Sequence, residues 1–121
     1  MKGPAMDTDK DLGTALLRWR RHLHQFPETG FREHRTADYV ASVLTALGLE
    51  VHRGIGGTGV VANLRAGSGG GAIGLRADMD ALAMAEQAPG RPYASQNPGC
   101  MHGCGHDGHM AMLLGAAQTL A

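Results

Sequence analysis

The segment of residues 101–109 constrains the fold of this chain more than any other feature of its sequence. Three histidines and one cysteine fall within eight positions, and three glycines are interspersed among them. Thiolate and imidazole are the ligands that zinc and similar divalent metals prefer. Because Gly103 and Gly105 flank Cys104, the backbone can turn sharply enough for Cys104 and His106 to approach one ion. The segment therefore predicts a metal-binding loop with Cys104 and His106 as ligands.

Three other interpretations of this segment stay open. The histidines can be a chance cluster on a solvent-exposed surface. Cys100 and Cys104 can form a disulfide, although a reducing compartment disfavours it. The segment can also be a closed structural metal site in a small binding module. For such a site the sequence offers five donors: Cys100, His102, Cys104, His106 and His109.

A pair of carboxylates, Asp78 and Asp80, follows the apolar run of residues 72–77. The run predicts a β-strand, and ligands of α/β sheets bind beyond the carboxyl ends of the strands. On an extended chain, side chains two residues apart point the same way. Such a pair can ligate a metal or orient a histidine that does so. A solvated acidic turn is the alternative.

Hydrophobic periodicity predicts three helices. The first begins near Thr8 and stops before Pro27, because the residue preceding a proline avoids the helical region. The second spans residues 33–47, with Gly48 as its C-cap. The third begins near His106. Its apolar stripe is expected to comprise His109, Leu113, Ala116, Ala117 and Leu120.

Strands are predicted at residues 49–52, 60–64 and 72–77. Helices packed on a sheet give an α/β fold. The stretch from 83 to 100 has no clear period, and long loops of this kind are usually functional or disordered. His22 and His24 lie near the end of the first helix, where the helix dipole favours them without any function.

Composition excludes several classes of protein. Eleven basic residues balance eleven acidic ones, so no nucleic acid or anionic membrane is expected as a partner. No apolar run approaches the roughly 20 residues of a transmembrane helix, and the N-terminus does not resemble a secretory signal. A cytoplasmic location is the default. Glycine is abundant (19 residues) and aromatics make up only 4%, which leaves few large anchors for an independent core.

Four motifs occur in an order that is typical of one enzyme family. They lie at residues 23–28 (LHQFPE), 54–60 (GIGGTGV), 75–82 (LRADMDAL) and 101–109 (MHGCGHDGH). In these motifs the chain resembles the N-terminal segment of bacterial hippurate hydrolases and related N-acyl-amino-acid amidohydrolases. That group lies within the aminoacylase and carboxypeptidase family of metallopeptidases. The resemblance covers nearly all of the chain from about Leu16 onward.

The resemblance implies that residues 1–121 form the N-terminal part of a zinc-peptidase-like catalytic domain. Such a domain has a mixed sheet with flanking helices, and the lid domain of these enzymes is absent here. Complete sites of this kind hold two divalent ions: manganese, zinc, cobalt or nickel. Cys104 and His106 match two ligands, and Asp80 matches the acidic residue that supports the metal centre. Asp78 stands where many relatives place a ligand histidine.

The implied reaction is metal-assisted hydrolysis of a small N-acylated amino acid to a carboxylate and a free amino acid. Full-length relatives are often homo-oligomeric. In the family, a ligand glutamate, two ligand histidines and a general-base glutamate come later in the chain, so the 121 residues alone are expected to be inactive. The chain departs from the family pattern at residues 83–86 and in the extra thiol of Cys100. A non-catalytic truncated remnant is the alternative.

Overall fold

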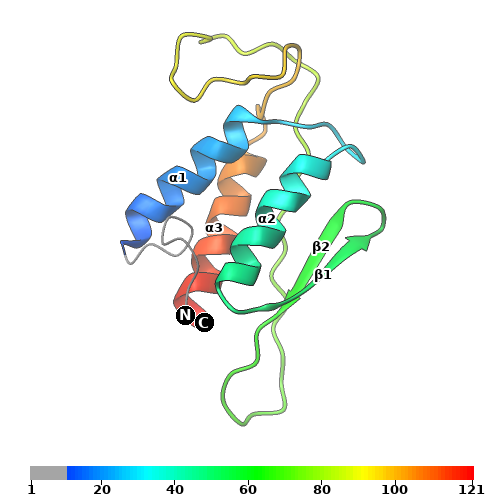
Figure 1. Ribbon diagram of the computed structural model, residues 1–121, viewed down its shortest axis with the longest axis vertical. Helices are drawn as coiled ribbons and strands as arrows, with labels where there is room; N and C mark the ends of the chain where they lie inside the picture. The colour runs from blue at the N-terminus through cyan, green and yellow to red at the C-terminus, as the bar shows by residue number, and fades with distance from the viewer. Residues whose placement is uncertain (1–10) are drawn as a thin grey trace.

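The computed structural model describes residues 11–121, which form three helices and one β-hairpin. In chain order the elements are α1 (Leu12–Gln25), α2 (His34–Ala46), β1 (Glu50–Ile55), β2 (Gly59–Asn63) and α3 (His106–Leu120). Helix α3 packs against both α1 and α2, and the hairpin contacts α2 (Figure 1). The long connection from β2 to α3 carries residues 83–100 past the C-terminal end of α1.

Within the described residues, helix α1 begins at Leu12. Its N-cap is Asp11, whose carboxylate accepts a hydrogen bond from the Gly13 amide (3.1 Å), and such a cap satisfies one of the free amides of the first turn. The predicted start at Thr8 lies outside the described residues. The helix ends before Pro27, as predicted, and it buries Trp19 and Leu23 completely in the core.

The second helix and the hairpin match their predictions closely. Gly48 adopts a φ of 90° after α2, which is the left-handed cap that glycine tolerates best. Strands β1 and β2 pair antiparallel, with Val51 opposite Ala62. Their register shifts between Arg53 and Ile55. The intervening Gly54 has a φ of 75°, which is outside the range of a regular strand. Val51 and Ala62 contact the helical core, so one face of the hairpin covers α2.

The predicted apolar stripe of α3 was wrong at His109 and Leu120, whereas Ala117 packs against the core as predicted, and the buried face is rotated by roughly one residue. The buried residues are Asp107, Met110, Ala111, Leu114 and Gly115, whereas His109 and Leu120 are exposed. The reason is the contact with α1. A Cβ atom at Gly115 would lie 2.7 Å from a methyl group of Leu16, so the two helices approach most closely where α3 has no side chain.

The predicted third strand was also wrong within the described residues. Residues 72–77 form no ladder, and Ile73 and Leu75 are 90% and 56% exposed. A strand needs a partner, and among residues 11–121 β1 and β2 pair only with each other. The α/β class is confirmed, with a two-stranded antiparallel sheet in this part of the chain. No helix between residues 11 and 121 is both long and apolar enough to span a lipid bilayer.

Candidate metal site at the start of helix α3

A short pairing between two distant loops brings Asp80 to the first residue of α3. The backbones of Leu82 and Met101 exchange two hydrogen bonds (2.9 and 3.0 Å), and Ala81 donates to the Glu28 carbonyl (2.8 Å). These contacts hold the acidic motif beside the glycine-rich loop. As a result, residues separated by more than 20 positions in the sequence lie within hydrogen-bonding distance.

The imidazole of His106 is oriented by Asp80. Its Nδ1 lies 2.9 Å from the Asp80 carbonyl oxygen and 3.0 Å from the Asp80 carboxylate. Both oxygens are acceptors, so Nδ1 must carry the proton, and a neutral ring then has its lone pair on Nε2. Metal-ligating histidines typically use this arrangement, in which one nitrogen donates to a carboxylate or a carbonyl and the other faces the ion.

Asp78 lies on the opposite side of the same ring. Its carboxylate is 3.7 Å from His106 Nε2 and 2.7 Å from the Arg76 guanidinium. The two aspartates thus approach different nitrogens of one histidine. Both side chains point toward the same ring, as the spacing of two residues on an extended chain predicted. The side chain of Asp78 is 37% exposed, although its Oδ1, the oxygen that faces Arg76, is buried.

Cys104 lies in a turn that glycines on both sides favour. Gly105 has a φ of 88°, and a Cβ atom at Gly103 would lie 2.5 Å from the Met84 sulfur. Both positions therefore disfavour any larger residue. The Cys104 thiol is free and exposed. Between residues 11 and 121, no three histidine, cysteine or acidic side chains are arranged to share one metal ion, so the closed structural site is not formed within them.

The neighbouring cysteine and histidine are buried. Cys100 is a free thiol, so the alternative of a disulfide to Cys104 was wrong for this structure. Burial, reinforced by the charge of Glu28, raises the pKa of the Cys100 thiol. His102 is 4% exposed, and neither ring nitrogen has a hydrogen-bond partner among the described residues. Desolvation lowers the pKa of His102, so its ring is neutral near pH 7.

Sequence reasoning missed the role of His24. It is 1% exposed, and its two ring nitrogens contact the carboxylates of Asp107 and Glu86. One signal in the sequence could have indicated this. Arg20 and His24 lie one turn apart on α1, so two basic side chains occupy the same face beside Leu23, which is an apolar core residue. His109 remains exposed, with its ring centroid 5.5 Å from that of His106.

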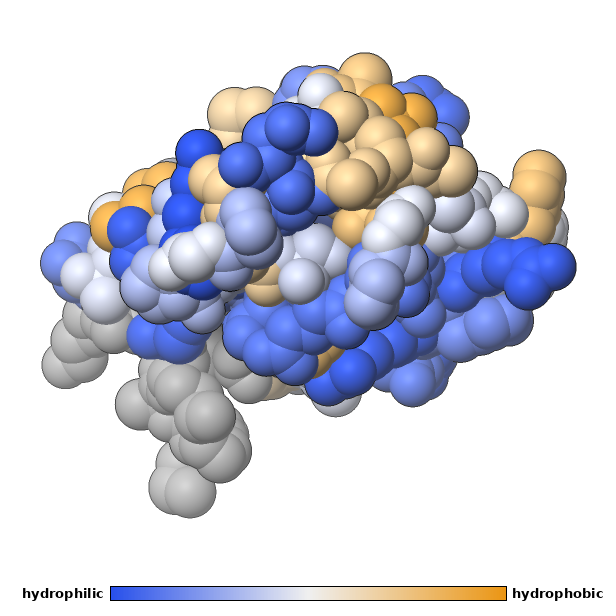
Figure 2. All heavy atoms as spheres, turned by 90° about the horizontal axis from the view of Figure 1, so that it is seen from above, coloured by the Kyte–Doolittle hydropathy of each residue, from blue (hydrophilic) through white to orange (hydrophobic). Residues whose placement is uncertain are grey.

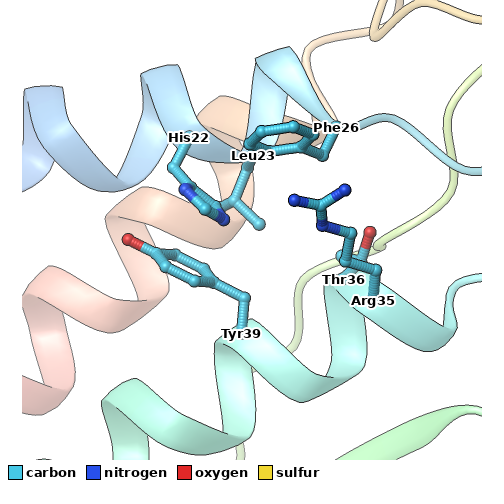
Figure 3. A pocket seen from close by; sticks show the side chains of 6 residues that line it. All are labelled: His22, Leu23, Phe26, Arg35, Thr36 and Tyr39. Carbon is cyan, nitrogen blue, oxygen red and sulfur yellow. The ribbon is translucent and has the colours of Figure 1, made fainter. Parts of the chain in front are cut away.

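Two hollows lie apart from the residues around His106. The first has essentially no room for a water molecule (Figure 3). In it, the rings of His22 and Tyr39 stack at 3.8 Å and Arg35 covers Phe26 at 3.7 Å. Its lining comprises His22, Leu23, Phe26, Arg35, Thr36 and Tyr39. The second holds about 290 Å³ and is lined by Phe26, Pro27, Glu28, Arg35, Gln96 and Asn97. Neither contains a proposed metal ligand.

Known proteins share the sequence and the fold of this chain. The family model described as peptidase family M20/M25/M40 matches residues 74–121. An N-acyl-L-amino acid amidohydrolase of Geobacillus stearothermophilus is 47% identical over 92% of the chain, and a hippurate hydrolase of Campylobacter jejuni subsp. jejuni is 48% identical over 92%. The chain spans only 30% and 29% of these two relatives.

A solved structure gives the same result. The YXEP protein of Bacillus subtilis, described as a dinuclear metal binding peptidase from the M20 family, superposes with a TM-score of 0.85 at 39% identity. The match covers 93% of this chain and 32% of that protein. The segment matched by the family model, residues 74–121, includes both the acidic motif and the glycine-rich loop. By sequence and by fold, this chain is therefore similar to the N-terminal part of M20 family peptidases.

Proposed function

We propose that the chain supplies part of the active site of a metal-dependent amidohydrolase that cleaves N-acyl amino acids. The observation that carries this proposal is the fixed tautomer of His106, with Nδ1 bound to Asp80 and the Nε2 lone pair left for a metal. Relatives named for N-acyl-L-amino acids and for hippurate support the class of substrate. Cys104 and His106 are the proposed ligands, and Asp80 is the residue that orients the ligand.

The chemistry of these groups suits a divalent transition metal. Zinc, cobalt, nickel and manganese are all candidates for this ion. A thiolate and an imidazole do not select one of these metals by themselves, because selection depends largely on the geometry of the complete site. When bound, such an ion acts as a Lewis acid that polarises an amide carbonyl and activates water. The description of the Bacillus subtilis neighbour as dinuclear supports a pair of ions.

Each residue of this chain has a distinct task in the proposal. Asp80 holds the ring of His106 in one tautomer and one orientation. Gly103 and Gly105 give Cys104 a backbone path that no larger residue could follow. Asp78 places a second negative charge beside Nε2, which strengthens the attraction of a cation to this side of the ring. The two free thiols support the proposal of a reducing, cytoplasmic location.

A chimera tests this proposal. We expect the 121 residues alone to show no metal-dependent turnover of N-benzoylglycine, because they offer fewer than three ligands for one ion. The chain would then replace the matching segment of the Geobacillus amidohydrolase. We expect manganese-dependent turnover from the chimera, and a loss of at least about 100-fold in kcat/KM for Cys104→Ser or His106→Gln.

The control is Asp38→Asn, since Asp38 is exposed on α2 and pairs only with Arg53 among the contacts of the described residues. This variant is expected to keep the activity of the chimera. Full activity in Cys104→Ser and His106→Gln would contradict the assignment of these two ligands. Clear turnover by the 121 residues alone would contradict the view that the site is partial.

A further inference from the structure

A buried cluster of charges lies beneath the glycine-rich loop. His24 Nδ1 is 2.8 Å from the Asp107 carboxylate, and His24 Nε2 is 3.1 Å from the Glu86 carboxylate. The side chains of His24, Asp107 and Glu86 are only 1%, 2% and 5% exposed. Arg20 adds a hydrogen bond to Asp107 at 3.0 Å. We call these four residues the His24 cluster.

The two carboxylates around His24 also bind other groups of the fold. The Glu86 oxygen that faces the ring accepts the Ser95 amide (3.0 Å). The Asp107 oxygen that faces the ring accepts from Arg20, and its other oxygen accepts the Gly108 amide at 2.9 Å. Each carboxylate is therefore held in place by its own backbone contact, and the ring of His24 is fixed between the two.

The cluster pairs basic with acidic side chains. Arg20 and His24 are basic, whereas Asp107 and Glu86 are acidic. Removing one buried member would leave polar atoms of its partners without a hydrogen bond, which is unfavourable. Buried pairs add little net stability over apolar residues of similar size, but some of them select one arrangement of the chain. The position of the His24 cluster indicates that it would select the arrangement of α1, α3 and the loop between them.

The cluster connects three segments that are distant in the sequence. His24 belongs to the last turn of α1, Glu86 to the loop of residues 83–100, and Asp107 to the first turn of α3. Asp107 directly follows His106, and it is three residues from Cys104. Any shift of the Asp107 carboxylate would therefore move the loop that carries both proposed ligands. Figure 1 shows α1 ending beside the start of α3 and below this loop.

We propose that His24 is a positioning residue, which holds the loop of residues 101–107 in the geometry required for metal binding. It does so through the contacts of its two ring nitrogens with the Asp107 and Glu86 carboxylates. The inference rests on the proposed function, because it assigns a purpose to the loop. It goes beyond that function in naming a residue that does not contact the metal and lies 80 positions before Cys104 in the sequence.

The test compares His24→Gln with His52→Gln in the complete chain. His52 is a half-exposed histidine on β1, outside the cluster. Cobalt is titrated and its thiolate charge-transfer absorption is followed, while nitrogen-15 spectra report the amides of Gly103, Gly105 and Gly108 without metal. In His24→Gln we expect the three amide signals to shift or broaden and the cobalt affinity to fall about 10- to 100-fold, as for partners of metal ligands. His52→Gln should match the unsubstituted chain in both measurements.

The outcomes separate this inference from the proposed function. If the unsubstituted chain gives no thiolate absorption with cobalt, the assignment of Cys104 as a ligand fails, and the glycine amides alone decide the positioning role. If folded His24→Gln keeps both the amide positions and the cobalt affinity, the positioning role is wrong. Should His24→Gln fail to fold, Glu86→Ala replaces it, since it removes the carboxylate that contacts His24 Nε2 and leaves the His24 ring in place. Unchanged glycine amides in folded Glu86→Ala would then overturn the proposal.

Discussion

Local spacing determines most of the chemistry around His106. The sequence predicted Cys104, His106 and Asp80 because turn-forming glycines and donor residues recur within a few positions. The structure adds the hydrogen bonds from His106 Nδ1 to Asp80, which spacing alone could not reveal. A carboxylate 26 positions away selects the tautomer, so the side of the ring available to an ion is set before any metal binds.

The two thiols differ enough for a direct chemical test. Cys104 is exposed, whereas Cys100 is buried and its pKa is raised, so Cys100 forms a thiolate only above the usual range near 8.5. With iodoacetamide at pH 7.5 we expect Cys100 to react at least about tenfold more slowly than Cys104, because the thiolate is the nucleophile. Mass spectrometry of the peptides measures both rates.

Raising the pH should accelerate the reaction of Cys100, because its thiolate fraction grows as the pH approaches its raised pKa. In urea the burial is lost, so both cysteines should react at similar rates. Equal rates in the folded chain at pH 7.5 would contradict the burial of Cys100.

The His24 cluster shows where sequence reasoning ends at this scale. His24 and Glu86 are 62 positions apart, and His24 and Asp107 are 83 apart. No local period relates them, so each is ambiguous alone: a histidine near a helix C-terminus is ordinary, and a glutamate in a loop is usually solvated. Only the packing of α1 against α3 reveals that the charges meet.

At the scale of elements, the approach of α1 and α3 fixes the position of the candidate site. The limits of the helices could be predicted from Pro27 and Gly48. The buried face of α3 could not, because a glycine in a helix does not register as apolar in a periodicity argument. Here Gly115 is the contact point, and Leu16 of α1 occupies the space that a side chain would need. The same contact brings the end of α1 to Asp107.

Gly115→Val tests this contact. The added side chain would overlap with Leu16, and overpacking of this kind typically costs about 1–3 kcal/mol. We expect urea denaturation to show a lower free energy of unfolding by that amount. Gly108→Ala in the same helix is the matched control, since a Cβ atom there meets nothing within 4 Å. Alanine favours helix over glycine, so this control should be neutral or slightly stabilising. Equal stabilities of the two variants would contradict the close approach at Gly115.

At the scale of the whole molecule, residues 11–121 form a small helical core that leaves several large apolar residues exposed. Hydrophobic patches interrupt the hydrophilic surface at the end viewed in Figure 2. The most exposed large apolar residues include Ile73 (90%), Phe31 (81%), Met112 (61%) and Leu120 (61%). The scarcity of aromatic residues predicted a limited core, and it centres on Trp19. The predicted strand at residues 72–77 was wrong for a physical reason. An apolar pattern in the sequence shows which side chains could be buried, but it does not show which strand would pair with the segment.

The central claim is that Cys104 and His106 bind the same divalent ion. Zinc-edge X-ray absorption of the zinc-loaded chain tests it most directly. We predict one sulfur neighbour at about 2.3 Å and imidazole scattering from a nitrogen at about 2.0–2.1 Å. Cys104→Ser should remove the sulfur shell and His106→Gln should weaken the imidazole signal. A zinc ion surrounded by oxygen alone, or a sulfur shell that persists in Cys104→Ser, would contradict the account.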